Sequence, residues 1–581
     1  MKRALKYIIR ILLGVVLLIV LLAASLYLPP VQRWAVNRLT AYLEEETGLE
    51  VSIGTVHLAF PLDLSLGQLH IAQPPTDVID VERVLVDLDL TRLLTLRVGV
   101  EAIELSDGSI CTTELIETLC MEGGIGSLRI VCDDVDLRKQ TVNVTDATLD
   151  GCVLNIQLRE VAEEDTTESA PVDWQIDIDQ VNIRQSKIAL RMPGDSMRVS
   201  AAIRQASFDG GDISLSQGAY RIGCISLSAD SLSYDIPQID SVAGLDVNHL
   251  AFYDMELQLD QLSYNQTSSV LNAQLRRLAF REKSGFILNN LAVNLSMDST
   301  HMTVAGLDLQ TPHSFASGNI NLDMSALSPN TRGQMKADVQ ASLGSEDVLC
   351  LAAAYLPDDL TAYYPSQPLN FDLYATGNVD SLALQTCTVT MPTILDVRAT
   401  GSVQNLTDST ALGADLKWDI TTMDLSCVRR YLHLDDVCFP RMVLHADTRL
   451  CRASQFFADA LLLEGKGRAH LTGNVDMQTM AYQANARITD LQLHDFLPHD
   501  SLYLLTANAK LSGRGTDMLS PRTVLRAQAA IDHLGYGSWN LDSIRADCSL
   551  EKGNAMIEMS SHNDLLCVQG CVDAADRKSV V

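Results

Sequence analysis

From about Val51 onward, apolar and polar residues alternate along the chain with a period of two. The apolar members of the clearest runs are Val172, Trp174, Ile176 and Ile178; Leu257 and Leu259; Val293, Leu295 and Met297; Ile320, Leu322 and Met324; and Leu416, Trp418 and Ile420. A period of two places successive side chains on opposite faces of a β-strand. The pattern therefore predicts a mainly β chain whose strands each have one apolar and one polar face.

A short phrase recurs within these runs: Gly, then Asn or Ser, then Val or Ile. It begins at Gly318, Gly377, Gly401 and Gly473. The spacing is too irregular for a strict solenoid, but the recurrence indicates a repetitive β-architecture. Short helices are expected only near 113–120 and 424–434.

The first segment has a different pattern. Lys2, Arg3, Lys6 and Arg10 precede an uncharged run from Ile11 through Leu18 to Leu28, which is 18 residues long. That length is the lower limit for a membrane-spanning helix, and the basic residues predict that residues 1–10 lie in the cytoplasm. The alternative is a cleaved signal peptide ending near Ala23-Ala24-Ser25, but the run exceeds a typical signal core.

Residues 29–48 follow helical spacing, with Val31, Trp34 and Leu39 among the apolar positions and Gly48 as a helix stop. We expect an amphipathic helix here that either caps the next domain or lies on a membrane surface.

The apolar strand faces can be buried in two ways. Two-layer sandwiches would bury them against each other, whereas one long curved sheet would leave them lining a groove. An exposed apolar surface of that size needs an occupant, and acyl chains are suitable. On this hypothesis the groove is lined by Val172, Trp174, Ile176, Ile178, Val293, Leu295, Ile320, Leu322, Met324, Leu416, Trp418 and Ile420.

Composition narrows the function classes. The chain has 581 residues and a net charge of -30, so no basic stripe is available for nucleic acid. Its 13 cysteines contain no Cys-x-x-Cys pair, which argues against a zinc ribbon. The acidic stretch 160–171 is expected to form a solvated loop between strands Val153–Leu158 and Val172–Ile178.

Candidate catalytic and ligand-binding motifs are weak. His494, Asp495, His499 and Asp500 lie within seven residues, but Pro498 interrupts them, so a polar turn is favoured over a metal site. Gly465-Lys466-Gly467 and Gly123–Gly126 do not complete a phosphate-binding loop, and Asp133, Asp134 and Asp136 lack the spacing of a calcium loop. The sequence predicts no catalytic, cofactor-binding or metal-binding residues, and no enzyme activity.

The amino-terminal region resembles a known family. A basic tip and single anchor precede Thr47-Gly48-Leu49-Glu50-Val51, then Ile53–Val56, Pro61–Ile71, Val81–Leu90 and Val100–Leu105. This order is similar to that of AsmA-like proteins, including the TamB (translocation and assembly module) group. The resemblance is specific over residues 1–110 and looser from 172 onward.

The resemblance implies an inner-membrane-anchored periplasmic protein whose apolar β-groove carries phospholipid acyl chains toward the outer membrane. The alternative is an assembly factor that pairs with strands of outer-membrane or secreted proteins. TamB proteins also have a carboxy-terminal domain that meets an outer-membrane barrel partner; no counterpart is recognisable before Val581, so the chain is expected to be a fragment or a shorter relative.

The predicted organisation is therefore a tip (1–10), a transmembrane helix (11–28), an amphipathic helix (29–48), a first β-region (49–159), an acidic loop (160–171) and a long, curved, repetitive antiparallel sheet (172–581).

Overall fold

The structure is a computed structural model. It describes residues 25, 27–47, 49–59, 63–73, 76–88, 100–112, 119–136, 141–159, 175–214, 218–353, 355, 358–517, 520, 522–551, 554–562 and 567–574. The chain forms two compact units, Met1–Asp298 and Ser299–Val581. Each consists mainly of β-strands that pair with their neighbours in the chain, which confirms the predicted fold class at this level.

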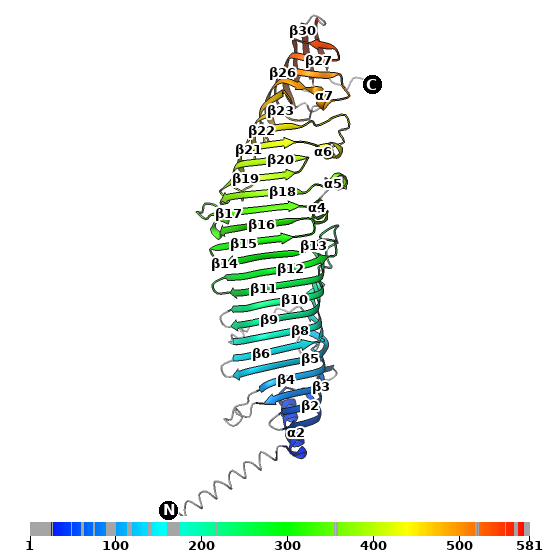
Figure 1. Ribbon diagram of the computed structural model, residues 1–581, viewed down its shortest axis with the longest axis vertical. Helices are drawn as coiled ribbons and strands as arrows, with labels where there is room; N and C mark the ends of the chain where they lie inside the picture. Colours follow the sequence, from blue (N-terminus) through cyan, green and yellow to red (C-terminus); the bar gives the residue numbers. More distant parts are fainter. Residues whose placement is uncertain are drawn as a thin grey trace, which may run out of the picture. The chain divides into compact units, whose positions relative to one another are not determined.

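In the first unit, strands succeed one another like rungs (Figure 1). They are β1 (Glu50–Ala59), β2 (Asp63–Gln73), β3 (Thr76–Leu88), β4 (Val100–Cys111), β5 (Leu119–Asp136), β6 (Thr141–Asp150), β7 (Val153–Leu158), β8 (Gln175–Arg191), β9 (Arg198–Ser214), β10 (Ala219–Asp235), β11 (His249–Asn265), β12 (Val270–Glu282), β13 (Ile287–Leu288) and β14 (Asn290–Met297), with a 3-10 helix η1 (Pro193–Asp195) between β8 and β9.

Helix α2 (Pro29–Thr47) ends within one residue of the predicted amphipathic helix. Two prolines at its start suit the first turn, where backbone N–H groups have no partner within the helix. The helix contacts β1: Gln32 is buried and its Nε2 donates to Leu58 O at 3.4 Å. Trp34, expected on the apolar face, is instead 69% exposed.

The predicted cytoplasmic tip and transmembrane helix lie outside the described residues, except for Ser25, Tyr27 and Leu28. Among the described residues, no helix has both the length and the apolar character needed to cross a membrane. The acidic stretch 160–171 also lies outside them, as do residues 113–118 of one predicted short helix, whose last two residues begin β5.

The prediction of a purely antiparallel sheet was wrong at one place. Strands β6 and β7 lie end to end against β5, and both pair in parallel with β8. The first residue of β8, Gln175, therefore lies beside Thr141, while its last, Arg191, lies beside Gln157. Pairing direction depends on where the chain between two strands runs, which the alternation within a strand does not reveal.

The long strands of the first unit bend at aligned corners. At each corner two consecutive exposed residues replace the usual one: Glu82 and Arg83 separate the buried Val81 and Val84 of β3. The same interruption occurs in β8 at Arg184-Gln185, in β9 at Arg204-Gln205 and in β11 at Tyr253-Asp254. Each is a bulge-like step that changes strand direction while keeping apolar side chains on one face.

Small side chains fill the inside of this corner, where Ser186, Ala206 and Ala229 are almost completely buried. Charged pairs lie outside it. Arg204 pairs with Asp230, and Arg281 pairs with Asp254. A second corner follows along Asp179, Gly210, Gly223 and Gln261, the residues skipped between successive pairs in the β8–β11 register.

The second unit contains shorter strands: β15 (His301–Gln310), β16 (Phe315–Asp323), β17 (Met335–Leu343), β18 (Leu369–Gly377), β19 (Ser381–Met391), β20 (Leu395–Gln404), β21 (Gly413–Thr422), β22 (Met442–Cys451), β23 (Gln455–Glu464), β24 (Gly467–Asp476), β25 (Ala481–Gln492), β26 (Leu502–Arg514), β27 (Val524–Tyr536), β28 (Trp539–Leu541), β29 (Ile544–Glu551), β30 (Asn554–His562) and β31 (Cys567–Ala574). Its strand pairs are antiparallel.

Short helices lie along one edge of this sheet (Figure 1). They are α4 (Ser345–Ala352), α5 (Asp358–Tyr363), α6 (Ser426–Tyr431) and α7 (Leu493–Phe496). A 3-10 helix η2 (Met324–Leu327) lies at the opposite ends of the strands, where Val379 N donates to Ala326 O. Only α6 was predicted. The recurring Gly phrase lies in β16, β20 and β24, and at the end of β18. Each of the first three strands is followed by one further strand and then a helical connection, which gives a four-strand repeat.

Candidate functional site: an uncovered apolar face

A continuous row of apolar side chains crosses the second unit. Strand pairing places Trp418 opposite Ala446, Ala446 opposite Ala460, and Ala460 opposite Leu471. The row continues through Ala486, Ala509, Ala529 and Ala546. Directly paired residues share a face of the sheet, so one face is apolar across β21–β29. We call this surface the apolar face.

The apolar face is hollowed between β23 and β29. The hollow has a volume of about 940 Å³. Its floor consists mainly of alanines, and bulkier side chains stand toward one end of the strands, where Phe456 pairs with Val475 and Val475 with Tyr482. Tyr482 pairs with Gly513, where a side chain would clash with the Tyr482 ring. Small floor residues beside larger ones make a channel rather than a flat surface.

The apolar face is not covered by a second layer among the described residues. Leu471 is 44% exposed, and Val475 and Leu511 are each 38% exposed. The largest fully buried side chains in the described part of the chain are Thr523, Asp246, Cys152 and Ser186, none of which is a large hydrophobic residue. A sandwich would instead bury such residues completely. The alternative of two-layer sandwiches therefore does not hold for the described residues, and the apolar side chains remain accessible.

The opposite face of the same strands is polar. Arg449 donates two hydrogen bonds to Asp415, and Asp419 and Asp459 pair with His445 and His470. Exposed pairs of this kind stabilise the fold little. They do establish which face meets water, and so leave the apolar face as the surface available to an apolar ligand.

The predicted groove residues fall in both units. Leu416, Trp418 and Ile420 lie on the apolar face in β21, and the Trp418 indole Nε1 donates to Thr448 Oγ1 at 2.8 Å. Ile320 and Leu322 lie in β16 of the same unit; Met324 begins η2, so its assignment to a strand was wrong. In the first unit, Val293 and Leu295 lie in β14 opposite Leu275 and Ala273.

Ile176 and Ile178 lie in β8, opposite Ile213 and Gly211. Val172 and Trp174 lie outside the described residues. The alanines of the hollow escaped the sequence reasoning because an alanine between polar residues is a weak apolar signal. Cys387 belongs to the same face, opposite Leu373 and Ala399. Burial raises the pKa of its thiol, so the side chain stays neutral.

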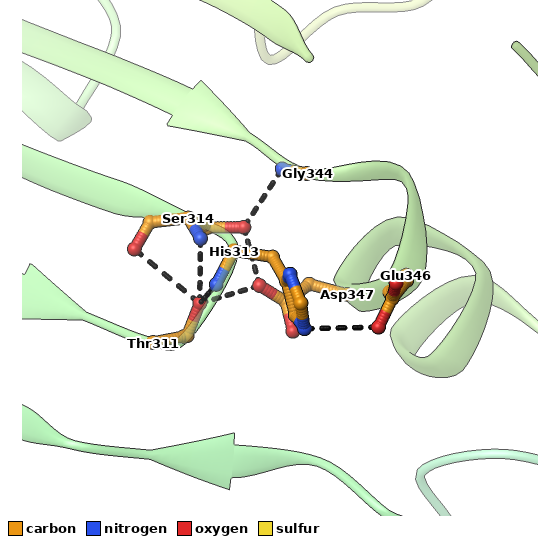
Figure 2. A network of polar contacts seen from close by, with 6 residues as sticks. All are labelled: Thr311, His313, Ser314, Gly344, Glu346 and Asp347. Carbon is orange, nitrogen blue, oxygen red and sulfur yellow. Dashed lines mark hydrogen bonds and ion pairs between the residues drawn. The ribbon is translucent and has the colours of Figure 1, made fainter. Parts of the chain in front are cut away.

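A buried polar cluster anchors α4 to the β15–β16 connection (Figure 2). The Asp347 carboxylate accepts hydrogen bonds from the hydroxyls of Thr311 and Ser314, each at 2.5 Å. Ser314 Oγ in turn accepts from Gly344 N at 2.9 Å. The His313 ring Nε2 lies 2.9 Å from a Glu346 carboxylate oxygen, and the His313 backbone N–H donates to Thr311 Oγ1 at 3.2 Å. The carboxylate ties both hydroxyls of the β15–β16 connection to the first turn of α4, and the backbone N–H of Gly344 completes the contacts, so this cluster positions the helix.

The segment that begins at His494 was predicted to be a polar turn, and it forms a short helix instead. Residues 493–496 form α7; the His494 ring stacks on Tyr503 at 5.0 Å, and its Nδ1 lies 3.2 Å from Asp500 O. Within the described part of the chain, no three histidine, cysteine or carboxylate side chains converge as metal ligands would.

No family model matches the chain, and none of the curated proteins is similar to it.

Proposed function

We propose that the apolar face of the second unit binds lipid acyl chains. The single observation that carries this proposal is an accessible apolar hollow of about 940 Å³ floored by alanines. Each methylene removed from water gains about 0.8 kcal/mol, so even partial coverage of an acyl chain is favourable. The occupant would in turn cover side chains that are costly to leave in water.

In this proposal the chain is anchored in the inner membrane, with its bulk in the periplasm, and passes phospholipid toward the outer membrane. The amino-terminal resemblance to AsmA-like and TamB proteins supports this setting. The alternative is an assembly factor that pairs with client strands. That alternative needs a strand edge that is free to pair with a client. Helix α2 lies against β1, and Gln32 donates to the Leu58 carbonyl of that strand. We therefore favour the lipid proposal.

The test fills the hollow in the full-length protein. Ala486 and Ala509 are directly paired at its floor. Ala486→Leu with Ala509→Leu adds apolar volume, and Ala486→Arg adds a charge whose desolvation costs a few kcal/mol. We expect both variants to capture severalfold less of a phospholipid with a photoreactive acyl chain.

The matched control is Thr489→Arg, which lies on the same strand as Ala486 but on the exposed polar face, outside the residues that line the hollow. It should capture as much lipid as the parent protein. Circular dichroism and limited proteolysis check that each variant is folded. Equal capture by folded floor variants and the control would refute the proposal, and recovery of outer-membrane proteins without lipid would favour the alternative.

A further inference from the structure

A second hollow lies at one edge of the first unit, where β8 ends, β9 begins, β10 ends and β11 begins. Its volume is about 400 Å³. The surrounding charged and titratable side chains are Arg191, Arg198, Lys283, Asp235, His249 and Tyr234. We call it the edge hollow. It is separate from the apolar face, which belongs to the second unit.

Positive charge is concentrated around the edge hollow. Arg191 and Arg198 are direct partners in the β8–β9 pair, and like charges placed opposite each other destabilise a sheet. Asp235 is the next residue in this row, opposite Arg198. Arg191 and Lys283 have no carboxylate partner among the described residues. Three cations thus surround one hollow that has a single carboxylate, in a chain whose net charge is -30.

Small residues and a hydroxyl pair lie beside these cations. Ala189 and Ala251 line the hollow together with Ser200 and Ser233, whose hydroxyl oxygens are 2.6 Å apart. One hydroxyl hydrogen joins the two serines, and the second is left to donate to a ligand. Guanidinium, ammonium and hydroxyl donors around a shallow hollow suit a phosphate oxyanion.

The loop 236–248 connects β10 to β11, two of the strands that border the hollow, and several of its apolar side chains are exposed to solvent. Ile239, Val242 and Val247 are 44%, 52% and 63% exposed. The loop is well ordered because the buried Asp246 carboxylate accepts hydrogen bonds from the backbone N–H groups of Val242 (2.9 Å) and Asn248 (3.1 Å). His249 Nδ1 lies 2.9 Å from the same carboxylate. Gln238 Nε2 also donates to Gly194 O in the β8–β9 connection.

We propose that the edge hollow binds the phosphate of a phospholipid, and that the aliphatic side chains of loop 236–248 contact the adjoining apolar part of the same lipid. Inorganic phosphate carries the same negative charge as the phosphate group of a phospholipid. It has no apolar part, however, that Ile239, Val242 and Val247 could contact. The aliphatic loop therefore favours a lipid as the source of the phosphate. This inference concerns the first unit and does not depend on acyl-chain binding by the second.

The experiment uses the full-length protein in an uncharged detergent and two probes, dihexanoyl phosphatidylglycerol below its micelle concentration and inorganic phosphate. Binding is measured by titration calorimetry. Arg191→Glu with Lys283→Glu should weaken lipid binding by about tenfold or more, because two charge-assisted contacts become repulsive. Val242→Ser with Val247→Ser should weaken lipid binding but leave phosphate binding unchanged.

The matched control is Arg487→Glu with Arg526→Glu, which makes the same change of net charge at exposed positions of the second unit that line neither hollow. It should bind the lipid as the parent protein does. If the edge and control variants lose equal affinity, the site is overturned. If inorganic phosphate binds as tightly as the lipid and the serine variant binds both normally, the lipid assignment is overturned. Because the probe reports on the headgroup contact, failure here is distinguishable from failure of acyl-chain capture by Ala486 and Ala509 variants.

Discussion

At the scale of single residues, Glu464 is the clearest example of an ionisable group that is buried away from water. Its side chain lies at the end of β23, where the residue is only 6% exposed, and Oε2 has no hydrogen-bond partner. Desolvation raises the pKa of Glu464 above its ordinary value of 4.5, and the nearby Asp495 carboxylate raises it further. The folded state therefore favours the protonated acid.

This placement gives a prediction with a definite sign. The raised pKa means that the folded protein is most stable, as far as Glu464 is concerned, below pH 4.5, and loses stability as the pH rises from there through the folded pKa. Glu464→Gln should thus raise the thermal unfolding midpoint at pH 7, by a stabilisation of about 1 kcal/mol, and should have little effect at pH 4. The exposed Glu558→Gln is the control. A midpoint that falls at pH 7 would contradict the prediction.

At the scale of elements, the loop 236–248 depends on one carboxylate. Hydrogen bonds from Val242 N–H, then from Asn248 and His249, hold the pKa of Asp246 below its ordinary value of 3.8. The stabilisation is present above pH 3.8 and is lost as the pH falls through the folded pKa. Amide hydrogen exchange in this loop, corrected for intrinsic rates, should become severalfold faster below that pH.

The Asp246→Asn variant separates this effect from general acid unfolding. It retains an acceptor oxygen but no charge, so its loop should exchange at a rate with much weaker acid dependence. The β10 and β11 amides serve as an internal reference. An identical acid response of loop and strands in both proteins would show that Asp246 does not control the loop.

Strand alternation predicted the elements best where strands are straight. It located β14, β16, β21 and the segment of β11 between its two corners, but it missed the corners; helix α2 was located by its helical spacing instead. A period-two reading fails at a step such as Val81-Glu82-Arg83-Val84, because two consecutive residues there face outward. The signal is in the sequence, but it becomes recognisable only when the register shows the same step in neighbouring strands. The parallel pairing of β6 and β7 with β8 has no local signal.

The candidate site was predictable to a similar extent. Leu416, Trp418 and Ile420 were identified as apolar positions, and they do lie on the apolar face. Whether that face is covered depends on the tertiary structure. Strands of a two-layer sandwich show the same alternation of apolar and polar residues as strands of a one-layer sheet, so the alternation does not tell the two apart. The edge hollow was not predictable, because Arg191, Asp235 and Lys283 come together only through the register of β8–β12.

At the scale of the whole molecule, each unit is a single layer in which a strand contacts mainly its neighbours in the ladder. Such an architecture is quasi-one-dimensional, so stability is a sum of local terms rather than the property of one shared core. A large apolar face can then stay accessible to a ligand without unfolding the sheet, because backbone pairing and the polar face maintain each strand.

Gly401 offers a test of this view within the second unit. Its φ of 143° and the position of Asp415 O, 2.0 Å from where a Cβ would lie, leave no room for a side chain. Gly401→Ala should destabilise β20 by about 1–3 kcal/mol. In a one-layer sheet, faster hydrogen exchange should be confined to β19–β22 and should leave β26 and β27 unchanged. If protection falls equally in all these strands, the unit folds around a shared core, and an apolar face open to lipid would no longer follow from its architecture.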